Sequence, residues 1–158
     1  MGGASSVPIM LSTLHVLFQS SFGDTQVLYG DSSKTAERQN LVLSGDVEWE
    51  DEGWLYIGST QREERYSLDG FLQCRDPGDT AEQALEAAFA LTAAVETLLR
   101  SLVQPNNQAL AQALAAGFPG QSVYVVNIEF KPKAGRAFPA DEGVAYQIDF
   151  GIAITARI

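Results

Sequence analysis

The chain has 158 residues and a mass of 17.0 kDa, and 46% of its residues are hydrophobic, which suffices for one domain with a full core. It carries 10 Lys and Arg against 20 Asp and Glu, so its formal net charge is −10 and its pI is about 4.4. This charge disfavours a generally phosphate-binding surface, and with it nonspecific nucleic-acid binding. One cysteine, Cys74, and one histidine, His15, allow neither an intrachain disulfide nor a Cys/His zinc site.

The N-terminal part of the chain predicts a short leader and then a helix. Residues 1–6 are small and polar and are expected to form a flexible leader, so that residues 7–158 make a single domain. No Lys or Arg precedes Lys34, and no apolar run approaches the roughly 20 residues of a membrane span, so we expect synthesis in the cytosol without signal peptide or membrane anchor. Residues 6–22 predict the first helix, with Pro8 in its opening turn.

Short segments after this helix predict the start of a meander. Residues 25–29 are β-branched and aromatic and predict a strand. Residues 41–43 form a second apolar run, which leads into a turn predicted at residues 44–46. Residues 54–57 predict a further strand.

Residues 62–74 predict a long strand of an antiparallel sheet with one buried face, because apolar and polar side chains alternate along them. Gly70, within this strand, indicates a bulge or a close approach of another backbone. The predicted inward face holds Tyr66, Leu68, Leu72 and Cys74.

The longest helix is predicted over residues 79–103. Asp79 followed by Glu82 is a start that resembles a capping box. Its apolar stripe is wide, as is typical of a helix that lies on a sheet, and its alanines favour close approach of the sheet over that of a neighbouring subunit. The stripe comprises Ala84, Leu85, Ala88, Phe89, Leu91, Val95, Leu98, Leu99 and Leu102.

The last third of the chain predicts a weak helix over residues 106–116 and two paired strands over residues 123–131 and 144–158. Residues 132–143 between these strands predict a loop long enough to indicate a function or mobility. The order of elements, without regular βαβ alternation, predicts an α+β fold: a mainly antiparallel sheet with a long central helix and an N-terminal helix packed on one face. In the first of the two strands a common face is predicted for Tyr124, Val126, Ile128 and Phe130.

Motifs for catalysis are absent from the sequence, which has no Walker A, dinucleotide-binding, zincin or nucleophile-elbow pattern. His15 lies among apolar residues of the first helix and is interpreted as structural, and Cys74 is interpreted as an ordinary buried thiol. We therefore expect no enzyme activity, no catalytic residues, no cofactor and no bound metal.

An acidic run is the most unusual local feature, with five carboxylates in seven residues. A calcium site is disfavoured because the EF-hand spacing is missing, and an acid/base pair is disfavoured because exposed turn carboxylates lack a pocket that separates their pKa values. The remaining interpretations are a solvated hairpin tip, an acidic lumen or rim that repels DNA, and a patch for a basic partner. The run consists of Asp46, Glu48, Glu50, Asp51 and Glu52.

A motif of mixed charge opens the long strand and is interpreted as a patch of cross-strand or intersubunit ion pairs. Surface pairs contribute about 0–1 kcal/mol each, so we expect them to select a partner more than to stabilise the fold. The motif consists of Arg62, Glu63, Glu64 and Arg65.

Several segments together resemble the tail terminator (tail completion) proteins of long-tailed bacteriophages, particularly phages of actinobacteria. The resemblance covers most of the chain and rests on diffuse hydrophobic patterns. The residues that carry it are Val7 to Ile9 with Leu14 and Phe18, Val27 to Gly30, Ile57 and Gly58, Arg62 to Tyr66, Ala87 and Phe89 to Leu91, Val95 and Glu96, and Tyr146 to Ile158.

This resemblance implies a structural virion protein at the head-proximal end of the tail. Such a protein forms a ring, generally of six subunits, that stops polymerisation of the tail tube and presents a docking surface to the head connector. The implied partners are copies of itself, the major tail tube protein and the head-tail connector or stopper protein, and DNA passes through the ring without specific binding.

The predicted docking elements are two loops, residues 46–53 and 132–143. In the second, Lys133, Arg136 and Phe138 suit a mobile arm anchored by an aromatic side chain, although a loop with Phe138 folded onto its own domain is an equal alternative. Another neck component, such as a head-completion or connector protein, remains the alternative function. A small α+β domain that binds a metal or ligand through the acidic run is a further one.

Overall fold

The computed structural model describes residues 5–30, 39–54, 62–76, 81–104, 106–120, 123–139 and 143–157, and the side chains of residues 50–54, 62, 76 and 81 are outside this description. The predicted leader therefore falls outside it up to residue 4, as do the cap at Asp79 and most of the strand predicted at residues 54–57. The elements in chain order are α1 (Val7–Ser21), β1 (Gln26–Tyr29), β2 (Gln39–Trp54), β3 (Arg62–Asp76), α2 (Ala81–Leu102), α3 (Ala109–Gly117), β4 (Tyr124–Pro139) and β5 (Val144–Arg157).

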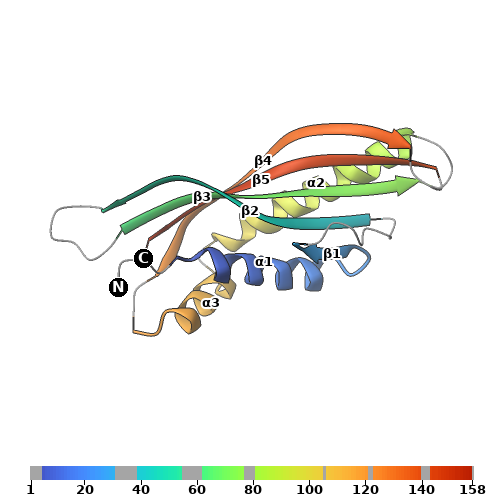
Figure 1. The fold of residues 1–158 in the computed structure, drawn as a ribbon. Coiled ribbons are helices and arrows are strands. Elements are labelled where there is room, and N and C mark those ends of the chain that lie inside the picture. The colour runs from blue at the N-terminus through green and yellow to red at the C-terminus, as the bar shows by residue number, and fades with distance from the viewer. Residues whose placement is uncertain are drawn as a thin grey trace.

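The five strands form one sheet in the order β1-β2-β3-β5-β4, in which only the short pair of β1 and β2 is parallel. Helix α2 packs against β3, β5 and β4, and α1 packs against β1, β2 and α3. Figure 1 shows the helices together on one side of the sheet. The predicted α+β fold, with a long central helix and an N-terminal helix on one face, is confirmed.

Strand β3 has the alternation that its sequence predicts. Tyr66, Leu68, Leu72 and Cys74 are all buried in the core between sheet and helices. Gly70 lies on the same face, where a Cβ would come within 2.5 Å of the Val42 carbonyl oxygen and 2.8 Å of the Phe150 ring. The predicted close approach at Gly70 is therefore confirmed.

Strand β2 corrects the prediction of a turn at residues 44–46. These residues form an irregularity inside one continuous strand, because the register with β3 shifts between Leu43 and Val47. Gly45 takes φ +84°, and the Ser44 hydroxyl donates to the Asp69 carbonyl oxygen at 2.9 Å, so the extra residues are held within the pair. Beyond this bulge, residues 47–54 of β2 and 62–68 of β3, here called the arm, run past the start of α1 (Figure 1), and on its other side β3 stays paired with β5 as far as Glu63.

Strand β4 corrects the predicted loop at residues 132–143. It continues to Pro139 and stays paired with β5 as far as Val144. Pro132 is accommodated because β4 is an edge strand and its register shifts between Pro132 and Ala134. A first shift, between Val125 and Asn127, also corrects the predicted common face, since Val126 is exposed whereas Ile128 is buried.

Helix α2 has a narrower buried stripe than predicted. Ala84, Ala88, Leu91, Val95, Leu99 and Leu102 are buried against the sheet, and Leu98 is half-buried. Leu85 and Phe89, expected to widen the stripe, are exposed because they lie at its margin, where the Phe89 ring contacts the Tyr146 ring only from the side. Helix α3 matches the weaker helix predicted over residues 106–116, with its start shifted to Ala109.

Candidate functional site

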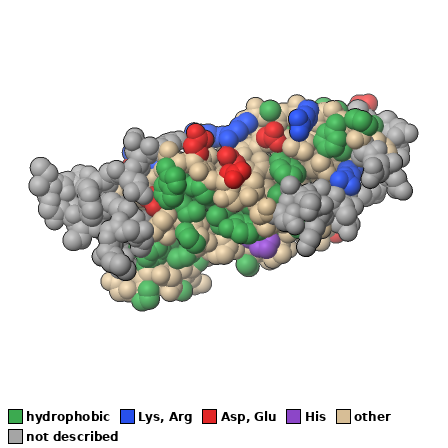
Figure 2. Space-filling model, in the orientation of Figure 1, with side chains coloured by type: hydrophobic (Ala, Val, Ile, Leu, Met, Phe, Trp, Pro, Cys, Tyr) green, Lys and Arg blue, Asp and Glu red, His purple; other side chains and the backbone are tan. Residues whose placement is uncertain are grey.

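The face of the sheet opposite the helices, here called the outer face, carries a row of polar side chains. It arises from the same alternation that buries the core, because every second residue of β3 and β5 points away from the helices. In Figure 2 acidic and basic side chains lie along the upper side of the molecule, where the sheet in Figure 1 has no helix above it. Central residues of the outer face are Ser67, Asp69, Phe71, Gln73 and Arg75 of β3 and Gln147, Asp149, Gly151 and Ala153 of β5.

A ladder of hydrogen bonds crosses the outer face from β3 to β5. The Arg75 guanidinium donates to Gln73 Oε1 at 3.1 and 3.2 Å, and Gln73 Nε2 lies 3.4 Å from Gln147 Oε1. Gln147 Nε2 in turn donates to Asp149 Oδ1 at 2.9 Å. These side chains are therefore held by one another on the outer face of the sheet.

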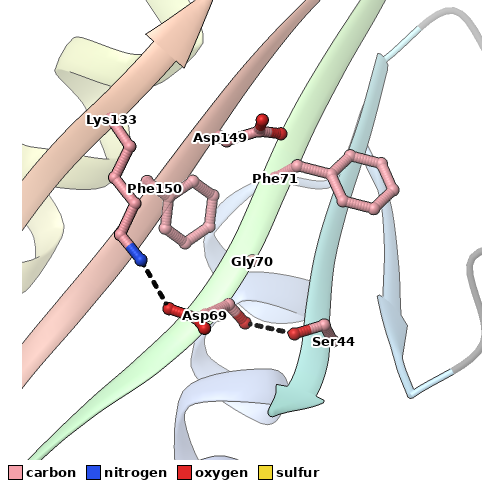
Figure 3. A pocket seen from close by; sticks show the side chains of 7 residues that line it. All are labelled: Ser44, Asp69, Gly70, Phe71, Lys133, Asp149 and Phe150. Atoms are coloured by element: carbon pink, nitrogen blue, oxygen red, sulfur yellow. Dashed lines mark hydrogen bonds and ion pairs between the residues drawn. The ribbon is translucent and has the colours of Figure 1, made fainter. Parts of the chain in front are cut away.

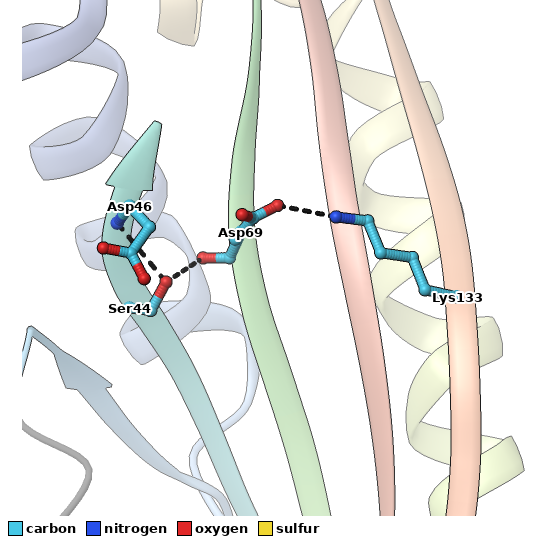
Figure 4. Close-up of polar contacts among 4 residues, drawn as sticks. All are labelled: Ser44, Asp46, Asp69 and Lys133. Atoms are coloured by element: carbon cyan, nitrogen blue, oxygen red, sulfur yellow. Dashed lines mark hydrogen bonds and ion pairs between the residues drawn. The ribbon is translucent and has the colours of Figure 1, made fainter. Parts of the chain in front are cut away.

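An ion pair between Lys133 and Asp69 spans three strands. Lys133 Nζ reaches from β4 across β5 and donates to Asp69 Oδ1 of β3 at 2.8 Å (Figure 4). Gly151 makes this crossing possible, because a Cβ there would lie 3.1 Å from Lys133 Cε. The hydrogen bond to Asp69 raises the pKa of Lys133, and the carboxylates of Asp69, Glu48 and Asp149 raise it further.

Beside this pair lies a shallow hollow of about 240 Å³ (Figure 3). Its polar groups are engaged with neighbours: the Lys133 ammonium donates to Asp69, and the Ser44 hydroxyl donates a hydrogen bond to a backbone carbonyl oxygen instead of to a base. Among the described residues, no group of three or more His, Cys, Asp or Glu is placed to hold a metal ion. The hollow is lined by Ser44, Asp69, Gly70, Phe71, Lys133, Asp149 and Phe150.

The acidic run is not at a hairpin tip, which corrects that interpretation. Asp46 and Glu48 lie within β2, where both side chains are exposed, and Asp46 N donates to Ser44 Oγ at 3.3 Å. Glu50, Asp51 and Glu52 belong to the same strand, and their side chains fall outside the described residues. The structure thus brings the first two carboxylates to the neighbourhood of Asp69 and Lys133.

The mixed-charge motif separates into a surface part and a buried part. Glu63 accepts a hydrogen bond from Arg65 Nε at 2.6 Å and lies 3.7 Å from Arg157 Nε on the neighbouring strand, so the predicted cross-strand pair is present. Glu64 contradicts the prediction of a surface pair, because its side chain is buried and accepts hydrogen bonds from Ser6. The side chain of Arg62 is outside the described residues.

Lys133, Arg136 and Phe138 lie on β4 instead of on a mobile loop, which corrects that prediction. Arg136 pairs in register with Gln147, and Phe138, half-buried, pairs with Ala145. An extended backbone paired over this length holds the three side chains in fixed positions. A role in docking would therefore use a rigid strand surface.

The two residues interpreted as structural stand in ordinary surroundings. The His15 ring lies 3.4 Å from the Val27 carbonyl oxygen and beside the Tyr29 ring. Cys74 is buried, and burial raises its pKa to about 11. No helix among the described residues is both long and apolar enough to cross a membrane.

Sequence reasoning missed several large apolar side chains that the fold leaves at the surface. Phe89 is 53% exposed, Trp49 46% and Val126 44%. Phe89 and Val126 have the spacing of core residues. Phe89 is exposed because it lies at the margin of the buried stripe of α2, and Val126 is exposed because of the bulge in β4. Neither feature is visible in the sequence. Trp49 alternates with charged residues, a signal that favours a strand with one apolar face.

Family models and curated protein sequences give no relative from which to transfer a function. No protein-family model matches the chain, and no curated protein sequence matches it significantly.

Proposed function

We propose that this protein is a structural component of a phage virion that caps the head-proximal end of the tail tube. In this role it assembles into a ring, of six subunits if it follows the family that its sequence resembles, stops tube polymerisation and offers a surface to the head connector. The ring forms in the host cytoplasm and contacts the tube protein on one side and the connector or stopper protein on the other. It performs no covalent chemistry.

The observation that carries this proposal is the difference between the two edges of the sheet. One edge is β4, whose outer backbone has no partner strand in the described part of the chain, and the other is formed by β1 and the arm. A closed ring needs two unlike surfaces on each subunit, since its interface is heterologous and repeats by rotation. An elongated sheet with unlike edges and helices on one face supplies such a wedge (Figure 1).

The β4 edge has the composition of a contact surface. Tyr124 and Val126, at its start, are both more than two-fifths exposed, and aromatic side chains are enriched at interfaces. Lys131 and Pro132 follow them, and such residues discourage unspecific pairing of an edge strand. Exposed apolar residues at the start of β4, followed by residues that discourage strand pairing, favour contact with one defined neighbour over open-ended aggregation.

Charge supports passage of DNA through the ring instead of its capture. The net charge is −10, and on the outer face the four carboxylates of Asp46, Glu48, Asp69 and Asp149 are accompanied by the cations of Lys133 and Arg75. Carboxylates repel the phosphates of a passing duplex and lower its adhesion.

The test is tube length in an assembly reaction with purified tail tube protein. We expect the wild-type protein to give capped tubes of uniform length and closed annuli in electron micrographs. Val126→Glu should abolish both while leaving the monomer folded, whereas Val16→Glu, at an even more exposed position on α1, should leave both intact. Uniform tubes with Val126→Glu would refute the role of the β4 edge.

Binding to separate virion parts distinguishes the alternative functions. A terminator must bind tube ends, whereas a head-completion or connector protein binds filled heads. Binding to heads alone would replace the proposed function with the connector function. A rise in melting temperature on adding calcium or magnesium would instead support the metal-binding alternative, because a ligand that binds only the folded state stabilises it.

A further inference from the structure

A buried cluster of polar side chains joins the start of α1 to β3. Ser6 donates twice to Glu64 Oε1, from its backbone N at 3.0 Å and from its hydroxyl at 2.6 Å. The Tyr66 hydroxyl lies 2.9 Å from Ser6 Oγ. All three residues are at most 1% exposed, although they come from chain segments 58 and 60 positions apart.

This cluster replaces a local helix cap. Ser6 occupies the N-cap position of α1, yet its hydroxyl makes no capping bond within the helix, and the first turn holds no acidic residue. The carboxylate of Glu64 therefore supplies the negative charge that the positive end of the helix dipole favours. The start of α1 depends in this way on a residue of the arm, at the position where Glu64 pairs in register with Glu52 of β2.

The cluster also extends to the surface of the arm. The Trp49 ring packs against the Tyr66 ring at a centroid distance of 5.5 Å, and the two residues are register partners. Trp49 remains 46% exposed, on the side of the sheet that α1 covers farther along. A continuous line of contacts thus runs from an exposed indole on β2, through the buried phenol of β3, to the first turn of α1.

Both bonds from Ser6 to Glu64 depend on one oxygen. They end on Glu64 Oε1, whereas Glu64 Oε2 is buried and has no hydrogen-bond partner in the described part of the chain. A displacement of β3 at Glu64 therefore strains both bonds together, because they share one acceptor. The β2 register also shifts between Trp49 and Glu52, opposite this point, and such bulges bend a strand pair.

We propose that Ser6, Glu64 and Tyr66 form a latch that couples the arm to the first turn of α1. A displacement of the arm at Trp49 loosens the start of α1, and loss of the bonds at Ser6 loosens the arm. The coupling itself is independent of the proposed function, and only its use during ring assembly rests on that function. In a ring, contact of the arm with a neighbouring subunit would loosen the first turn of α1 through these bonds.

The first experiment perturbs the helix end and measures the arm. The chain has two tryptophans, so Trp54→Phe leaves Trp49 as the single reporter of fluorescence. In this background Ser6→Ala should shift Trp49 emission and increase its quenching by iodide about twofold. Ser12→Ala, which removes an exposed hydroxyl from the same helix, is the matched control and should change neither.

The second experiment perturbs the arm and measures the helix. Hydrogen exchange at the amides of Met10 and Leu11 should accelerate about tenfold in Trp49→Ala and in Tyr66→Phe, but not in Val126→Ala, an exposed change on β4. Tyr66→Phe keeps the ring and removes only the hydroxyl, so it stays interpretable if Ser6→Ala fails to fold. Coupling of this kind must be reciprocal, which makes the two experiments a joint test.

Two results would overturn the latch. One is faster exchange at Met10 with unchanged Trp49 emission, which would make Glu64 a local cap without communication to the arm. The other is unchanged exchange in Tyr66→Phe. Both measurements use the isolated chain, so they can succeed or fail whether or not the protein caps tail tubes.

Discussion

The two faces of the sheet differ in what their side chains contact, although the same strands build both. On the helix side, Phe150 of β5 lies against Phe130 at a ring distance of 5.1 Å and above Gly70, fully inside the core. On the outer face, Phe71 of β3 is half-buried and lines the same hollow as the charged pair of Asp69 and Lys133 (Figure 3). One alternating pattern thus specifies the fold with one set of residues and leaves the other set free for interaction.

Truncation of a phenylalanine on each face separates the two roles most strongly. Phe150→Ala should lower the free energy of unfolding by about 3–5 kcal/mol, because it empties a fully packed position. Phe71→Ala, one strand away on the outer face, should cost about 1 kcal/mol, since the side chain already contacts water. Urea unfolding followed by circular dichroism measures both. Equal losses would contradict the assignment of the core to one face.

The close approach at Gly70 gives the second largest effect. Gly70→Ala should destabilise the fold by about 1–3 kcal/mol, because the added methyl group meets the backbone oxygen of Val42 at 2.5 Å and the ring of Phe150. Gly23→Ala is the matched control, since no atom lies within 4 Å of a Cβ there, and it should stay within about 0.5 kcal/mol of wild type. A neutral Gly70→Ala would show that the strands separate more readily than their packing indicates.

The sequence predicts most of the buried residues on the helix side of the sheet but few of the contacts on the outer face. Alternation along residues 62–74 and the helical periods of α1 and α2 identify the core, because burial imposes a period that single residues rarely obscure. The errors fall at irregularities: the bulge at Ser44 to Asp46 was predicted as a turn, and the bulge after Pro132 as a loop. Both segments contain turn-forming residues, and only pairing with a neighbouring strand keeps them extended.

The candidate site could not be predicted because its members meet only through the sheet. Asp69 and Lys133 are 64 positions apart, and their ion pair depends on the missing side chain of Gly151 between them. Glu64 was predicted as a surface charge from its charged neighbours, whereas strand alternation places it on the buried face beside Ser6. In such a motif the period of the strand is a better guide than local charge.

The thiol of Cys74 tests how completely water is excluded from the side of the sheet that the helices cover. Burial raises its pKa from 9.0 to about 11, so the folded state favours the protonated thiol. Its contribution to stability is complete below pH 9 and falls between pH 9 and 11, by at most about 1.4 kcal/mol per pH unit, because the unfolded chain ionises first. Unfolding curves of wild type and Cys74→Ala across this range should diverge, and parallel curves would contradict a buried thiol.

The ion pair on the outer face should have the smallest effect on stability. The side chains of Lys133 and Asp69 are 47% and 34% exposed, so solvent screens their attraction, and a double-mutant cycle of Lys133→Met with Asp69→Asn should give a coupling energy of about 0–1 kcal/mol. Gly151→Val should remove the same coupling without altering either charge, because its side chain blocks the path of Lys133 across β5. A coupling above about 2 kcal/mol would place the pair in a desolvated environment and remove the distinction between the two faces. If the coupling energy between Lys133 and Asp69 is small, the fold of Lys133→Met stays intact. Any loss of tube capping in this variant is then a loss of contact with a partner in the assembly.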